Sequence, residues 1–272
     1  MEEEIVDEYF LKHPKPGLWI FDILTTESEW VLRVKKNDVP VVCFDDLKGG
    51  VLAADLVINA IAGCWNEAPA GPQVLSGPQY AVINSGILGF KKKKSLSEGA
   101  IKVGVTLGGS DTHGATIRIA QALSEITDID VTFFIGPHFL HDEELNNALP
   151  KLSLQHSVKK FVQNIHKELS EMDVVICGGG QTLFELCAMG MPALALANEP
   201  HEEKTISYFY RHGACANIGS VYRTIDSGKI RQFFKKLRSE PEEVHRMKIN
   251  AQKLVDGMGT SRCYSECIKV VK

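Results

Sequence analysis

The sequence has no long apolar run and no excess of positive charge. No stretch reaches the roughly 18 consecutive apolar residues that a membrane-spanning helix needs. The formal net charge is −4, whereas proteins dedicated to nucleic-acid binding usually carry a basic surface. The chain opens with Met1 and three glutamates, the reverse of the basic start of a secretory signal peptide. We therefore expect a cytoplasmic protein that neither spans a membrane nor binds nucleic acid.

Metal-ligand patterns are also missing. The seven cysteines are odd in number and scattered along the chain. Cysteines in or near apolar runs are typical of buried, reduced thiols that pack as small apolar side chains. Five have this setting: Cys43, Cys64, Cys177, Cys187 and Cys215. Cys263 and Cys267 are spaced i, i+4, and His138 lies close to His141, but neither pair has the further ligands of a tetrahedral site. We expect no metal ion and no other cofactor.

Short apolar runs alternate with helical patterns along nearly the whole chain. The runs are almost continuous Val, Ile, Leu and Ala, which is typical of parallel strands covered on both faces. Strands are predicted at 17–24, 39–46, 54–61, 101–109, 130–136, 152–155, 173–177 and 192–197. Helices are predicted at 2–12, 27–36, 114–125, 142–149, 165–171, 182–189, 203–212, 227–238, 241–255 and 260–270. This alternation predicts doubly wound parallel sheets.

A stretch rich in proline and glycine, residues 62–99, separates two such series. We therefore expect an α/β protein of two Rossmann-like lobes, each with a parallel sheet, and a cleft between them. Residues 1–95 form the first lobe with its linker, and this lobe is incomplete because only about three strands are evident. Residues 96–272 form the second lobe, whose last helix is expected to pack back on the first.

Two glycine-rich turns in the second series share one design. Gly108-Gly109-Ser110-Asp111 and Gly178-Gly179-Gly180 each join an apolar strand to a helix. Glycines allow a tight turn and close approach of a ligand to the backbone. The helix that follows offers free N–H groups and the positive end of its dipole to a phosphate. Neither turn contains the Gly-Lys-Ser/Thr of a P-loop or the spaced G-x-G-x-x-G fingerprint. Together they predict a phosphate site.

Two interpretations are open for the helix that follows the second turn. Thr182-Leu183-Phe184-Glu185 fits a capping box, in which the threonine caps the helix and the glutamate reaches back. Alternatively, Glu185 accepts hydrogen bonds from a ribose diol while Thr182 and the backbone hold phosphate. The local sequence favours neither.

Several segments carry a family resemblance: VTLGGSD, MDVVICGGGQTLFELCAMGMPALAL, HGACANIG and VDGMGTSRC. In their order and spacing they resemble the UDP-sugar hydrolase of pseudaminic acid biosynthesis and the related spore coat polysaccharide biosynthesis proteins. More distantly, they resemble the N-acetylglucosaminyltransferase of peptidoglycan synthesis. FDILTTESEW, VCFDDL and GPQYAVI resemble the later part of the hydrolase's first lobe. The resemblance covers residues 17–270 and implies a GT-B architecture whose second lobe holds the nucleotide.

The resemblance also implies roles for individual residues in binding UDP or a UDP-sugar. The diphosphate or sugar would lie beside Gly108, Gly109 and Ser110. The diphosphate would be held by Gly179, Gly180, Gln181 and Thr182. Glu185 would bind the ribose hydroxyls, Val162 to Ile165 would offer backbone groups and an apolar edge to the base, and Asn198 would lie near the sugar.

Two departures from the family pattern are evident. The family begins with a strand and a Gly-x-Gly-His turn whose histidine is the expected catalytic residue, and no such motif occurs in this sequence. The chain therefore corresponds to a first lobe that starts late, and a second copy or another chain is expected to pair with the uncovered sheet edge. The segment ANEPHEEKT, residues 197–205, replaces the family's Ala-Glu-Asn-Gln. Its extra carboxylates would repel a diphosphate.

Candidates for the catalytic base are few. His201 and His113 are the available histidines near the predicted site. Asp45 and Asp46 follow a strand and could form a carboxylate pair, but together with Asp22 they are more typical of structural strand ends.

The sequence thus predicts a nucleotide-sugar-binding protein of surface polysaccharide or nonulosonic acid biosynthesis. The first hypothesis is hydrolysis of a UDP-amino sugar, with nucleotide binding retained and hydrolysis weak. The alternatives are a glycosyltransferase on the same scaffold and a non-catalytic nucleotide-sugar-binding protein or scaffold.

Overall fold

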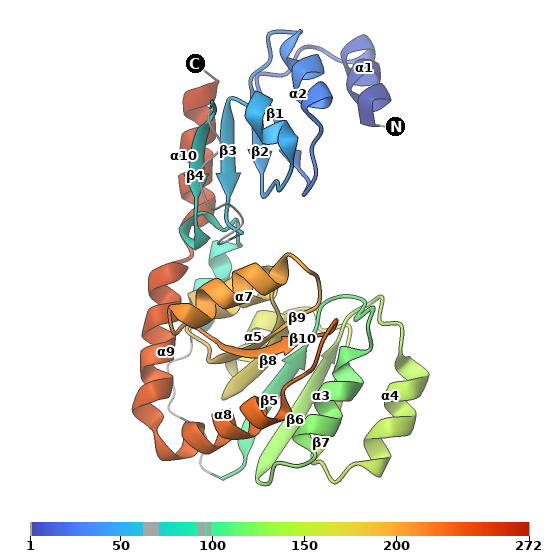
Figure 1. Ribbon diagram of the computed structural model, residues 1–272, viewed down its shortest axis with the longest axis vertical. Coiled ribbons are helices and arrows are strands. Elements are labelled where there is room, and N and C mark those ends of the chain that lie inside the picture. Colours follow the sequence, from blue (N-terminus) through green and yellow to red (C-terminus); the bar gives the residue numbers. More distant parts are fainter. Residues whose placement is uncertain (1, 62–70, 92–95, 97–98, 272) are drawn as a thin grey trace. The chain divides into compact units, whose positions relative to one another are not determined.

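The chain folds into two compact units in a computed structural model that describes residues 2–61, 71–91, 96 and 99–271. The first unit contains Met1–Ile83 and Gly257–Lys272, and the second contains Asn84–Asp256 (Figure 1). The lobe boundary expected at 95/96 thus lies at 83/84, and the last helix belongs to the first unit. Cys64 and much of the stretch 62–99 fall outside the described residues.

The sheet of the first unit has four parallel strands in the order β1-β2-β3-β4. Their bounds are β1 Trp19–Asp22, β2 Val41–Phe44, β3 Leu56–Asn59 and β4 Gln73–Ser76. The expectation of three strands was wrong by one. Strand β4 was not predicted because only two of its four residues, Val74 and Leu75, are apolar, and because the strand lies in a segment rich in proline and glycine.

Helices cover both faces of this sheet, and this explains the continuous apolar runs. The helical elements are α1 Glu2–Lys12, α2 Ser28–Lys35, the short 3₁₀ helices η1 Gly49–Ala53 and η2 Pro78–Tyr80, and α10 Gly259–Val270. On β2, Val41 and Cys43 pack into one core with residues of α1 and α2, while Val42 packs into the other core with Cys263 and Cys267 of α10. The i, i+4 cysteine pair therefore serves packing. Burial raises the pKa of Cys263 to about 11, so its thiol is neutral.

The second unit has a six-stranded sheet in the order β10-β9-β8-β5-β6-β7, and every named pairing is parallel. The bounds are β5 Ile101–Thr106, β6 Ile129–Ile135, β7 His156–Lys160, β8 Val174–Gly178, β9 Ala193–Ala197 and β10 Ala216–Ser220. The strand predicted at 152–155 lies at β7, and β10 was not predicted. Both are outermost strands of this sheet, and the mostly polar, exposed β7 lacks the apolar signal of a buried strand.

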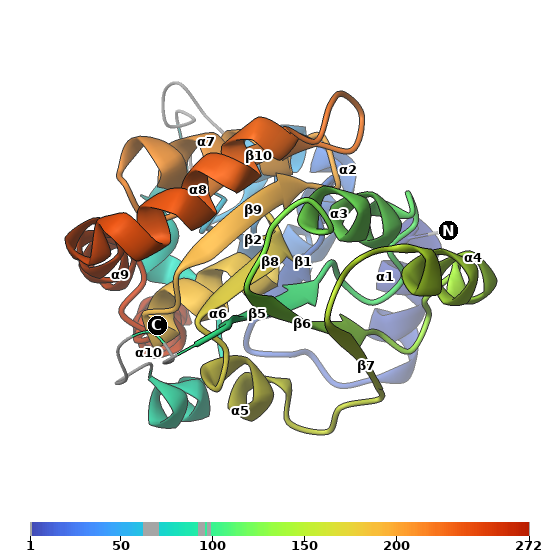
Figure 2. The same ribbon diagram turned by 90° about the horizontal axis from the view of Figure 1, so that it is seen from below.

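The helices of this unit are η3 Ser85–Phe90, α3 Ala115–Leu123, α4 Asp142–Ala148, η4 Leu149–Lys151, α5 Ile165–Ser170, α6 Gln181–Met189, α7 Glu202–Arg211, α8 Ser227–Ser239 and α9 Pro241–Leu254. Helices α3, α4 and α8 pack on one face of the sheet, while α5 and α6 lie on the other (Figure 2). Cys177, Cys187 and Cys215 are buried in this unit, and burial raises the pKa of each thiol.

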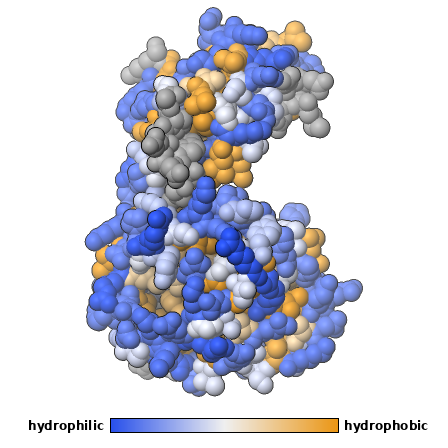
Figure 3. Space-filling model, in the orientation of Figure 1, coloured by the Kyte–Doolittle hydropathy of each residue, from blue (hydrophilic) through white to orange (hydrophobic). Residues whose placement is uncertain are grey.

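The surface is mainly hydrophilic on the face drawn in Figure 3, with small apolar patches in both units. None of the helices in the described part of the chain combines the length and the apolar character needed to cross a membrane.

Close packing explains why the segment VDGMGTSRC has a glycine at position 259. A Cβ atom added to Gly259 would lie 2.1 Å from the carbonyl oxygen of Ala81 in the same unit. We predict that Gly259→Ala lowers the free energy of unfolding by about 1–3 kcal/mol, since overpacking forces the backbone to move. Gly49→Ala is the matched control, because its added Cβ would meet only the Ser28 Oγ at 3.7 Å. Urea denaturation of both variants measures the difference, and equal stabilities would contradict the prediction.

Strand β1 is an outer strand of the described sheet in the first unit, and its Ile20 side chain is 49% exposed. Pairing of a second copy along a sheet edge remains a prediction. Light scattering should give the mass of a dimer, and Ile20→Lys should shift it toward the monomer because a charged edge disfavours pairing. A monomeric mass for the unchanged protein at micromolar concentration would remove this expectation.

Candidate functional site

The candidate site lies where the chain order reverses in the sheet of the second unit. From β5 the chain moves outward through β6 and β7, then returns to β8 on the other side of β5. Thr106 at the end of β5 lies opposite Cys177 near the end of β8. Both glycine turns predicted from the sequence therefore begin at this point. In open α/β sheets, ligands bind at such a switch point, outside the carboxyl ends of the strands.

The first turn, Gly108 and Gly109, faces open space. A Cβ atom added to either residue would have no heavy atom within 4 Å, and Gly108 has a φ of +91°. The loop after β6 supports this turn from behind. A Cβ on Gly136 would lie 2.5 Å from the carbonyl oxygen of Gly109, and the backbone N–H of His138 donates to that same oxygen at 3.1 Å. Close backbone packing on one side leaves the other side of the turn accessible.

The helix after this turn is capped from within the chain. Asp111 is buried and has a φ of 43°. Its two carboxylate oxygens accept hydrogen bonds from the backbone N–H groups of Ala115 and Thr116, each at 2.8 Å. The start of α3 therefore already holds an anion, so the open part of this loop is Gly108 to Ser110.

The second turn is packed against α7. The carboxylate Oε2 of buried Glu202 accepts hydrogen bonds from the backbone N–H groups of Gly179 at 3.1 Å and Asn198 at 2.7 Å. A Cβ on Gly179 would lie 2.8 Å from the Cβ of Glu202 and 2.8 Å from the Cδ1 of Ile206. The absence of a side chain at Gly179 is thus required by packing. The donors that remain at this turn are at Gly180 and at Thr182, since N–H groups of a first helical turn have no intrahelical acceptor.

The capping-box interpretation of this helix start was wrong. Gly180 occupies the N-cap position of α6, without a side-chain cap, so Thr182 lies inside the helix. The Glu185 carboxylate turns instead toward His166 on α5, with Oε2 at 3.0 Å from Nε2. His166 is not evident as a site residue from the sequence, because nothing near it in the chain shows that α5 lies beside α6.

Asn198 connects the ends of three strands. It follows β9, its backbone N–H donates to Glu202, and its Nδ2 donates to the carbonyl oxygen of Leu107 at 3.4 Å. Its Oδ1 is buried without a hydrogen-bond partner in the described part of the chain. An added Cβ on Gly178 would lie 2.8 Å from its Nδ2. Asn198 therefore fixes the spacing of the two turns.

A polar relay of three residues lies at the same edge of the sheet. His113 follows β5, Glu199 follows β9 and Tyr222 follows β10. The Tyr222 hydroxyl donates to Glu199 Oε2 at 3.3 Å and lies 3.2 Å from His113 Nε2. Desolvation, followed by the Glu199 carboxylate, raises the pKa of Tyr222. The phenol keeps its proton at neutral pH, and its oxygen can accept from the Nε2–H tautomer of His113.

The other predicted residues are placed as follows. His201 immediately precedes α7, and among the described residues its side chain has no hydrogen bond or ion pair. Val162 to Ile165 form the loop that enters α5. The preceding residue, Phe161, was not predicted from the sequence; it is 71% exposed and has a φ of 55°. A bulky residue with a positive φ has a strained backbone, and such strain clusters at functional sites.

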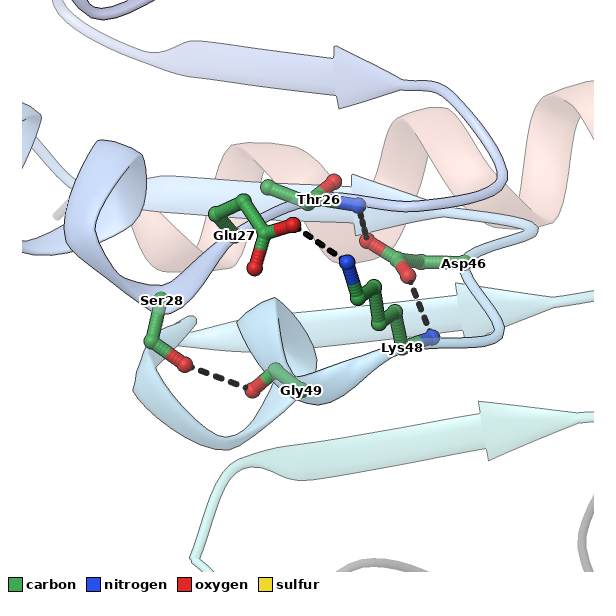
Figure 4. A network of polar contacts seen from close by, with 6 residues as sticks. All are labelled: Thr26, Glu27, Ser28, Asp46, Lys48 and Gly49. Atoms are coloured by element: carbon green, nitrogen blue, oxygen red, sulfur yellow. Dashed lines mark hydrogen bonds and ion pairs between the residues drawn. The ribbon is translucent and has the colours of Figure 1, made fainter.

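Asp45 and Asp46 in the first unit have structural contacts. Buried Asp46 accepts the backbone N–H groups of Thr26 at 3.0 Å and Lys48 at 2.8 Å (Figure 4). Asp45 accepts the backbone N–H of Ala60 at 2.6 Å. Burial raises the pKa of Asp45, and Asp22 contributes in the same direction. These contacts tie the loops after β1, β2 and β3 together, as expected of structural strand ends.

Comparisons with known proteins bear on this site. The spore coat polysaccharide biosynthesis protein SpsG of Bacillus subtilis (strain 168) is 25% identical over 260 residues, which cover 93% of this chain and 76% of SpsG. The UDP-N-acetylglucosamine--N-acetylmuramyl-(pentapeptide) pyrophosphoryl-undecaprenol N-acetylglucosamine transferase of Pseudomonas savastanoi pv. phaseolicola is 25% identical over 158 residues. These cover 56% of this chain and 44% of the transferase.

Solved structures show the fold. MurG of Acinetobacter baumannii matches with a TM-score of 0.69 at 15% identity, covering 98% of this chain and 76% of MurG. The spinosyn rhamnosyltransferase SpnG complexed with thymidine diphosphate matches with a TM-score of 0.58 at 15% identity, covering 97% and 77%. The chain therefore has a GT-B-like α/β fold with parallel sheets.

These relatives favour the glycosyltransferase alternative over the expected UDP-sugar hydrolase. Residues 81–259 match the glycosyltransferase family 28 C-terminal domain, a range that contains both glycine turns, His166 and the polar relay. By this match the chain belongs to the glycosyltransferase family 28 C-terminal domain family.

Proposed function

We propose that the chain binds a nucleotide sugar, with UDP as the first candidate nucleotide, and acts as a glycosyltransferase in polysaccharide biosynthesis. The observation that carries this proposal is the open turn at Gly108 and Gly109 beside the start of α6, at the switch point of a Rossmann-like sheet. The family match and the resemblance to SpsG support the same function.

The residues divide into three zones in this proposal. The diphosphate lies against the backbone of Gly108 to Ser110 and receives hydrogen bonds at the start of α6, from Gly180 and Thr182. Helix N-termini favour such anions. The ribose lies against Glu185, and the base against the loop of Val162 to Ile165, where exposed Phe161 offers an aromatic face.

Charge determines where the transferred sugar fits. Glu199 follows β9, and carboxylates repel a diphosphate but accept hydrogen bonds from hydroxyl or amino groups. The sugar therefore extends from the diphosphate toward Glu199 and the His113–Tyr222 pair, while Asn198 keeps the two turns at a fixed spacing.

The open turn gives the sharpest test of nucleotide binding. Gly109→Val adds a side chain into space that the protein leaves free, so we predict unchanged thermal stability. We also predict an affinity for UDP reduced about tenfold or more, because the ligand would collide with the new side chain. Isothermal titration calorimetry measures the affinity. Gly89→Val is the matched control, since a Cβ there also has no atom within 4 Å.

If Gly109→Val binds UDP as tightly as the unchanged protein does, the turn holds no phosphate. Gly179→Val cannot serve this purpose, because its side chain would collide with Glu202 and Ile206 whether or not a nucleotide binds.

The relay gives the test of catalysis. In the proposal His113 is the general base and Tyr222 orients it, since both lie at the carboxyl edge of the sheet and His201 has no oriented partner among the described residues. We predict that His113→Ala lowers the rate of UDP release from a UDP-sugar about 10²-fold or more. UDP affinity should stay within about twofold, because His113 acts on the acceptor and not on the nucleotide.

His201→Ala is the control and should leave the rate near that of the unchanged protein. A larger loss with His201→Ala than with His113→Ala would reverse the assignment. UDP release with free sugar and without any added acceptor would favour the hydrolase, whereas release that requires an acceptor favours the transferase.

A further inference from the structure

The pair formed by His166 and Glu185 is the least explained polar contact near the site. Oε2 of Glu185 lies 3.0 Å from Nε2 of His166, and the two side chains are only 18% and 22% exposed. This Nε2 is buried and has no hydrogen-bond partner of good alignment in the described part of the chain. An imidazole nitrogen enclosed against a carboxylate calls for a role beyond filling space.

Both residues project from backbone that is held in place. His166 is the second residue of α5, whose start is capped by Asn164 through a hydrogen bond from the Lys167 N–H at 3.1 Å. Glu185 lies on α6 between buried Phe184 and Leu186. The short helix η3 contacts both α5 and α6. The imidazole and the carboxylate therefore meet because two fixed helices lie side by side, not because two mobile surface groups happen to approach.

We infer that His166 is a positioning residue for ribose recognition, an inference that rests on the proposed function. The imidazole engages Oε2 and leaves Oε1 of Glu185 to accept the ribose hydroxyl groups. A free glutamate side chain loses rotational freedom when it binds a ligand, and a carboxylate already held in place loses less. His166 thereby makes the site selective for ribonucleotides over nucleotides that lack ribose hydroxyls.

The positioning role and a merely structural role predict different changes in ligand affinity when His166 is removed. If His166 only stabilised the packing of α5 on α6, its removal would weaken all nucleotides equally. If it acts through Glu185, only ligands with ribose hydroxyls are affected. A glutamine at this position places its amide nitrogen, Nε2, near the position of the histidine Nε2 and should rescue binding, whereas alanine should not.

The experiment compares UDP with 2′,3′-dideoxyuridine diphosphate by isothermal titration calorimetry on the full chain. We expect His166→Ala to weaken UDP about tenfold and to leave the dideoxy ligand within about twofold. His166→Gln should recover most of the UDP affinity. His166→Ala should cause no further loss in a Glu185→Gln background, since coupled residues are not additive. Lys167→Ala, the exposed neighbour on α5, is the control, and thermal midpoints verify folding.

The outcomes separate the inference from the function on which it rests. An unchanged UDP affinity in His166→Ala, or an equal loss for both ligands, overturns the positioning role while nucleotide binding stands. A full further loss in the Glu185→Gln background overturns it as well. If the unchanged protein binds neither ligand, the proposed function falls and the inference falls with it.

Discussion

The buried carboxylate of Glu202 is the interaction on which the candidate site depends. It accepts backbone N–H groups from Gly179 and Asn198, so a single side chain from α7 joins the ends of β8 and β9. Hydrogen bonds to a charged group contribute about 1.5–3 kcal/mol each, and their loss would leave buried donors unsatisfied. Through Gly179, this carboxylate fixes the start of α6 and thus Glu185. Through Asn198, it fixes the distance to the end of β5 at Leu107.

The two glycine turns look alike in sequence, but each contains glycine for an opposite physical reason. Gly179 is glycine because α7 packs directly against it, whereas nothing in the protein lies within 4 Å of a side chain at Gly109. Each turn also has an internal acid, Glu202 at one and Asp111 at the other, which takes backbone N–H groups that a phosphate could have used. Glycine content and helix dipole alone therefore do not locate a phosphate. In the proposed function, the phosphate binds on the side of the turn that the protein leaves open.

Most of the fold could be predicted from the sequence because buried parallel strands have continuous apolar runs, as at Ile101–Thr106 and Val174–Gly178. The prediction failed at β4, β7 and β10, which are outermost strands with only one or two large apolar residues each. The turns at Gly108 and Gly178 were also found from local pattern. The partners of their residues were not: Glu202 lies 23 residues beyond Gly179, and His166 belongs to a different helix from Glu185. Such pairings are set by tertiary packing. The local capping motif at Thr182 predicted that Glu185 reaches back to the helix start, whereas its carboxylate faces His166.

The acidic residues at the carboxyl edge of the second unit's sheet make the two ends of the candidate site different in charge. Glu199 lies after β9, and the open backbone of Gly108 and Gly109 lies at the end of β5. In the proposed function, a diphosphate is repelled from the first side and accepted at the second, whereas hydroxyl groups are bound well by carboxylates. A nucleotide sugar has this same polarity, with anionic phosphates between a ribose and a neutral, hydroxyl-rich ring. The extra carboxylates that weakened the sequence-based assignment of a diphosphate site are consistent with one whose sugar end faces Glu199.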